Sequence, residues 1–149
     1  MKRFLLHLLL LTVYILPTRG QEGLHIDSLF STQHPYKQSS REVWVEGSRL
    51  KTYNLSLYRS YVMESLPEET DFVESLIEAD SKHAYSKETG RVGNRLYYAF
   101  LCLPPAQGQT NRYIFYRNAS LRKNGKRELT LVYMEGQVSF EQLKEIFKK

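Results

Sequence analysis

An Asn-Gly dipeptide between two alternating segments restricts the fold of this chain more than any other feature. Residues 111–120 and 126–134 read as strands, and Asn124-Gly125 lies between them. Both residues tolerate the positive φ angles of a type I′ turn, so Asn-Gly in this setting is a strong hairpin signal. The sequence therefore predicts an antiparallel β-hairpin near the C-terminus.

Three more strands are predicted before this hairpin. Residues 42–46 are rich in β-formers, and residues 53–63 alternate with the period of a half-buried strand. Residues 95–103 form a strand that Pro104-Pro105 ends, because proline cannot donate to a β-ladder.

Two helices are predicted from capping signals. Residues 65–68 match a capping box, and a helix to about residue 85 should follow. A second box joins Ser139 to Gln142, with a hydrophobic staple from Val138 to Leu143. We expect this terminal helix to dock on the sheet through Phe140, Leu143 and Phe147.

These elements predict an α+β fold with a four- to five-stranded, mostly antiparallel sheet and two helices on one face. Residues 41–149 would form a single domain, and residues 21–40 a partly irregular N-terminal segment. The 149-residue chain is 42% hydrophobic and 25% charged, which is typical of a globular protein.

Residues 1–20 have the pattern of a cleaved signal peptide, with Lys2 and Arg3 before a short apolar run. We expect export to the periplasm or the exterior, with no transmembrane anchor after cleavage. Cleavage would leave 18 basic and 16 acidic residues, a net charge of +2 in place of +5. Cys102 is the only cysteine, so no intramolecular disulfide is expected, and its apolar neighbours predict a buried thiol.

The sequence contains no established catalytic motif, and the predicted mature chain has only His25, His34 and His83 as histidines. We therefore expect no metal and no cofactor, and consider an enzyme less favoured than a binding module. Asp80 lies along the apolar stripe of its predicted helix. It is interpreted as a rim residue or a partner of Arg59, or alternatively as the acidic site of a hydrolase of unknown substrate.

One basic cluster is interleaved with aromatic residues. Residues 112–117 contain two arginines, and Arg122-Lys123 and Lys126-Arg127 flank the Asn-Gly turn. This composition allows polyanion binding, but export argues against nucleic acid as the partner. Basic residues near hairpins also protect edge strands from aggregation, and that interpretation is favoured.

The leading functional hypothesis is a binding or interaction module that uses the sheet face opposite the helices. Tyrosines occupy neighbouring strand positions, so one of each pair should reach that face, where tyrosine suits protein and sugar contacts. The partner would be an envelope protein, a glycan or a second copy of the chain. Alternatively, residues 22–36 cover this face, or the tyrosines make only cross-strand pairs. The candidate binding residues are Tyr58, Tyr97, Tyr98, Tyr116, Arg59 and Asp80.

Five segments resemble a family of short exported proteins from Bacteroidetes that has no assigned function. They are residues 21–30, 53–60, 94–100, 111–118 and 132–136. The resemblance covers most of the predicted mature chain and implies a Gram-negative host and an envelope or secreted location. It implies no catalytic residues.

Overall fold

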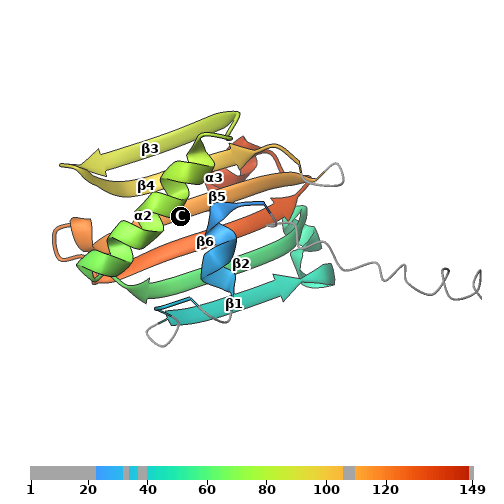
Figure 1. Ribbon diagram of the computed structural model, residues 1–149. Coiled ribbons are helices and arrows are strands. Elements are labelled where there is room, and N and C mark those ends of the chain that lie inside the picture. Colours follow the sequence, from blue (N-terminus) through green and yellow to red (C-terminus); the bar gives the residue numbers. More distant parts are fainter. Residues whose placement is uncertain (1–22, 32–33, 37–39, 106–109, 148–149) are drawn as a thin grey trace, which may run out of the picture.

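The computed structural model describes residues 23–31, 34–36, 40–105 and 110–147 (Figure 1). The predicted signal peptide, residues 1–20, lies outside this range. The described chain forms one six-stranded sheet in which each neighbouring pair is antiparallel, in the order β1-β2-β6-β5-β4-β3. β6 and β5 are therefore the two central strands, and β1 and β3 are the edges.

The elements follow one another in a mixed α and β order, as predicted. The strands are β1 (Ser40–Glu46), β2 (Leu55–Glu64), β3 (Ser86–Val92), β4 (Arg95–Leu103), β5 (Asn111–Asn118) and β6 (Glu128–Gly136). The α-helices are α2 (Pro67–Ser81) and α3 (Phe140–Phe147), and the 3-10 helices are η1 (His25–Phe30), η3 (Gly47–Tyr53) and η4 (Ala119–Leu121). Among the described residues, none of these helices is long and apolar enough to span a bilayer.

The sheet has six strands, so the expected four or five was too low. The strand that the sequence analysis missed is β3, an edge strand that pairs with β4. Its sequence is mostly polar or charged and contains Gly90, so it lacks the alternation of a half-buried strand. The sequence feature that could have predicted β3 is Gly93-Asn94 directly after it. These residues form a two-residue hairpin turn in which Gly93 has φ +59°.

The two α-helices lie on opposite faces of the sheet, which corrects the expectation that they share one (Figure 1). α2 and η1 cover what we call the α2 face, where Tyr61, Leu101 and Tyr133 are buried. α3 packs on the other side, the α3 face, against residues such as Phe100 and Tyr113. The central strands carry apolar residues on both faces, and both faces therefore need a cover.

The two capping boxes have different outcomes. At α3 the box is confirmed, because the Ser139 N–H donates to Gln142 Oε1 at 3.0 Å and the Gln142 N–H to Ser139 Oγ at 3.2 Å. At α2 the prediction was wrong. Pro67 occupies the first helical turn and makes Leu66 the N-cap residue, with no side-chain cap. α2 also ends at Ser81, earlier than expected.

Candidate ligand-binding site

The four predicted tyrosines do not form one surface. Tyr116 points to the α2 face and is completely buried, so it cannot reach a ligand. Phe115, its neighbour, takes the opposite face and packs under α3. Tyr58 also lies on the α3 face, where it is half-buried against the cluster beneath α3.

Tyr97 and Tyr98 lie together because β4 contains a bulge. Gly90 pairs with Tyr98 and Arg91 with Leu96, which leaves Tyr97 without a partner in β3. The two rings meet edge to face with centroids 5.9 Å apart, so both side chains lie on one side of the strand. In a regular strand the two side chains would point to opposite faces of the sheet, as was expected for neighbouring tyrosines. The Tyr98 hydroxyl donates to Glu88 at 3.3 Å.

Arg59 and Asp80 lie on the α2 face, and both hold the N-terminal segment. Asp80 is fully buried and accepts hydrogen bonds from the backbone N–H groups of His25 and Ile26, at 2.7 and 3.0 Å. Its Oδ1 also lies 2.9 Å from His25 Nδ1. Asp80 therefore caps η1 from another helix, and it is neither at the rim nor paired with Arg59.

The Arg59 guanidinium is stacked between two aromatic rings. Its central carbon lies 4.3 Å from the ring centroids of both Phe30 and Trp44. It also forms an ion pair with Glu42 at 2.5 Å. Only 4% of the Arg59 side chain is exposed, so its contacts join η1 to the edge strand β1 and give it a positioning role.

α3 covers the aromatic part of the α3 face, so the expected open aromatic surface is largely buried. Phe147 stacks on Phe115 with centroids 4.7 Å apart, and Phe140 meets Phe100 at 4.6 Å. The cover ends one residue row farther along the strands. In that row, Tyr98 of β4 lies opposite Arg117 of β5, and Arg117 lies opposite Thr130 of β6.

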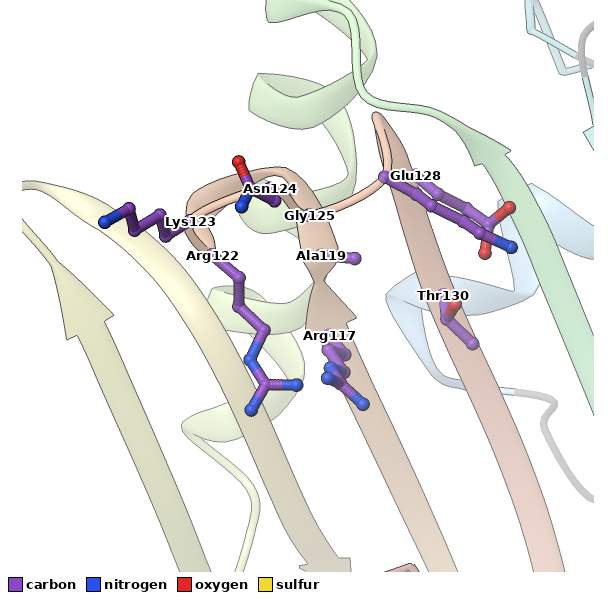
Figure 2. Close-up of a pocket in the computed structure, with 9 residues that line it drawn as sticks. Arg117, Ala119, Arg122, Lys123, Asn124, Gly125, Glu128 and Thr130 are labelled. Atoms are coloured by element: carbon purple, nitrogen blue, oxygen red, sulfur yellow. The ribbon is translucent and has the colours of Figure 1, made fainter.

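A hollow of about 390 Å³ opens in this uncovered part, beneath the connection between β5 and β6 (Figure 2). Arg117 contributes from β5, and Glu128 and Thr130 from β6. The remaining lining residues belong to the connection and are Ala119, Arg122, Lys123, Asn124, Gly125 and Lys126. Sheet and loop therefore both shape the hollow.

Two local features fold this connection over the sheet. Asn118 Oδ1 accepts the Ser120 N–H at 3.1 Å and so caps η4. Gly125 donates its N–H to Arg122 O at 2.9 Å. A Cβ on Gly125 would lie 1.8 Å from the carbonyl oxygen of Ala119, so only glycine allows this close approach.

The connection between β5 and β6 runs from residue 119 to residue 127, so it is longer than the residues 121–125 that the predicted strands left between them, and the predicted type I′ turn is wrong. Asn124 has φ +60°, as such a turn requires, but Gly125 does not adopt the left-handed conformation. The short helix η4 and the turn after it separate the two strands. The antiparallel pairing of β5 with β6 is confirmed.

Charge in the hollow is strongly positive. Four of the nine lining residues are cations, and one, Glu128, is an acid. Glu128 already forms an ion pair with Arg41 at 3.3 Å. These cations were visible in the sequence, where protection of an edge strand was the favoured interpretation. β5 and β6 are the central strands, so that explanation does not apply to them.

Within the described ranges, no three histidine, cysteine or acidic side chains are grouped as metal ligands would be. Cys102 is a free, buried thiol on the α3 face, as predicted. Burial raises the pKa of its thiol to about 11, which disfavours the reactive thiolate.

The chain belongs to a family of unknown function (DUF6108), whose profile matches residues 13–147. This agrees with the resemblance to an uncharacterised family. Neither a curated protein nor a solved structure matches the chain.

Proposed function

We propose that this protein is an exported bacterial binding module of the periplasm or cell exterior, and that it binds a ligand in the hollow on its α3 face. The proposal rests on one observation, the hollow at the end of the α3 face that α3 leaves uncovered. Export and bacterial origin are supported by the signal-like residues 1–20 and by the resemblance to exported proteins of Bacteroidetes.

The size of the hollow favours a small ligand or the end of a chain. Small-molecule sites span roughly 300–1,000 Å³, and this hollow of about 390 Å³ falls at the lower end. A flat protein partner would need a standard interface of roughly 800 Å² per side. We therefore favour a glycan over a protein partner or a second copy of the chain.

Tyr97 and Tyr98 support the glycan assignment. Tyr98 is the direct cross-strand neighbour of Arg117, and the Tyr97 ring contacts Tyr98 on the same side of β4. Tyrosine presents an apolar ring with a polar tip, which suits the apolar face and the hydroxyl groups of a sugar. Tyr98 is thus the cross-strand neighbour of a lining residue, and Tyr97 is connected to the hollow only through Tyr98.

Filling the hollow tests this function. Thr130→Trp should occupy it, whereas Thr89→Trp places the same bulk on the exposed edge strand β3. The purified protein and both variants would be screened by thermal shift against neutral, carboxylated, sulfated and phosphorylated oligosaccharides. We expect at least one sugar to stabilise the wild type and Thr89→Trp but not a folded Thr130→Trp. No stabilisation by any sugar, or equal stabilisation of all three proteins, would refute the proposal.

One contact favours a second candidate, a hydrolase near Asp80. His25 Nδ1 lies 2.9 Å from Asp80, the arrangement that orients an imidazole base, and 53% of the His25 side chain is exposed. However, both Asp80 oxygens also accept backbone N–H groups, which gives the carboxylate a capping role. Turnover of a chromogenic ester or glycoside that His25→Ala abolishes would favour the hydrolase. Turnover unchanged by His25→Ala would reject it.

A further inference from the structure

The cations of the hollow come from both of its sides. Arg117 projects from the sheet, and Arg122, Lys123 and Lys126 come from the connection above it. In Figure 2 the Arg122 side chain extends from the connection down over the strands, whereas Lys123 extends sideways, away from Arg117. Arg117 and Arg122 thus present guanidinium groups to the same hollow from two different elements.

These cations lack acidic partners. Within the part of the chain that the structure describes, no ion pair joins Arg117, Arg122, Lys123 or Lys126 to a carboxylate. Arg117 Nε is moreover buried without a hydrogen-bond partner. Buried polar atoms are nearly always hydrogen-bonded, and a desolvated charge is unfavourable unless it is compensated. An anion in the hollow would balance the guanidinium charge through the part of the Arg117 side chain that is accessible there.

Arginine is the side chain best suited to a planar or tetrahedral oxyanion. Its guanidinium donates two parallel hydrogen bonds to phosphate, sulfate or carboxylate, whereas lysine acts as a compact point charge. The hollow combines two arginines with two lysines. This set suits an anionic group with several oxygen atoms better than a neutral sugar.

We propose that the hollow binds a phosphate or sulfate group carried by a sugar. This inference rests on the proposed function and specifies its ligand. Arg117 and Arg122 bind the oxyanion, Lys126 adds charge, and the sugar ring lies toward Tyr98, which pairs with Arg117 in the sheet register. A nucleic-acid strand is less favoured because it needs a groove that follows several phosphates, whereas this hollow measures about 390 Å³ and lies beneath a single connection.

Calorimetric titration of the purified protein tests the ligand class. The probes are glucose, glucose 6-phosphate, glucose 6-sulfate, inorganic phosphate and a short single-stranded DNA. We expect both charged sugars to bind more tightly than glucose and than inorganic phosphate. The ratio of the dissociation constants of the two charged sugars shows whether the site prefers phosphate or sulfate. Tighter binding of the DNA than of either charged sugar, or equal binding of all sugars, would overturn the inference.

Two neutral variants test the residues. Arg122→Gln and Arg117→Gln should each weaken binding of the charged sugar about tenfold or more, because each removes charge-assisted hydrogen bonds to the oxyanion. Arg49→Gln, an exposed arginine in η3, is the matched control and should leave affinity unchanged. Arg122 is exposed, so its variant should fold even if Arg117→Gln does not. Unchanged affinity in Arg122→Gln would overturn the inference.

Different experimental results would reject the proposed function and this inference. If a sugar binds, Thr130→Trp abolishes its binding and the two glutamine variants do not alter it, then the hollow is a binding site but not an oxyanion site. If no sugar binds at all, both proposals are rejected.

Discussion

The carboxylate of Asp80 accepts the backbone N–H of Ile26 at 3.0 Å and so joins the last turn of α2 to a segment 54 residues earlier. The His25 N–H binds the other carboxylate oxygen at 2.7 Å. Side-chain capping usually acts within one helix, but here it acts between two. η1 is held in this way over the core, where Ile26 and Leu29 are fully buried.

Removing this acceptor should destabilise the fold. Asp80→Ala leaves two N–H groups without their partner, and each unsatisfied buried donor costs about 1–3 kcal/mol. We expect a loss of about 2–4 kcal/mol in the free energy of unfolding, measured by urea denaturation. Asp80→Asn keeps one carbonyl acceptor and should lose less. Equal stability of Asp80→Ala and the wild type would contradict the capping role.

Leu143 should anchor α3 to the sheet. Leu143 lies on the side of α3 that faces the sheet and is only 1% exposed. Truncating a buried leucine to alanine typically lowers the free energy of unfolding by about 2–5 kcal/mol. Ile146 on the same helix is 42% exposed and provides the matched control. We expect Leu143→Ala to lose stability in that range and Ile146→Ala to change it by less than about 0.5 kcal/mol. Equal losses in both variants would contradict the docking of α3 through this face.

Gly125→Ala should alter the hollow as well as stability. The added Cβ would lie 1.8 Å from Ala119 O, so the connection would have to move. Gly93→Ala is the control, because Gly93 has φ +59° but open space around its Cβ position. We expect both variants to lower the melting temperature, and only Gly125→Ala to weaken binding of the sugar ligand. Unaltered binding in Gly125→Ala would show that the connection does not shape the site.

The Cys102 thiol should resist alkylation in the folded protein. Burial raises its pKa from 9.0 to about 11, so the folded state holds the proton more tightly than the unfolded chain does. Stability should accordingly fall as the pH rises through this window. At mildly alkaline pH, iodoacetamide should modify the urea-unfolded protein but not the native one, as mass spectrometry would show. Rapid modification of the native protein would contradict the burial of this thiol.

Features encoded by neighbouring residues were the most predictable from the sequence. The capping box of Ser139 with Gln142, the end of β4 at Leu103 before two prolines, and the burial of Cys102 all follow from local patterns. The edge strand β3 was missed because an edge strand needs little apolar alternation. Its turn, Gly93-Asn94, was the local signal that remained unused.

Contacts between distant segments could not be read from spacing. Asp80 was interpreted as a rim residue or a partner of Arg59, but it binds His25 and Ile26, since sequence alone does not show which remote segment covers a helix. The prediction that α3 shares a face with α2 was wrong for a related reason, because apolar residues occur on both sides of β4 and β5 and do not show which face α3 covers. The cations of the hollow were visible as a cluster, whereas their position on central strands required the sheet order.

Mapping by nuclear magnetic resonance tests the central claim, that ligand binds in the hollow beneath the β5–β6 connection. Glucose 6-phosphate would be titrated into the isotope-labelled protein while backbone amide shifts are followed. We predict saturable changes at Arg117, Thr130 and residues 122–126, with smaller ones at Tyr98 and none along α2. Changes centred on His25 and Asp80, or spread evenly over the surface lysines and arginines, would contradict the claim.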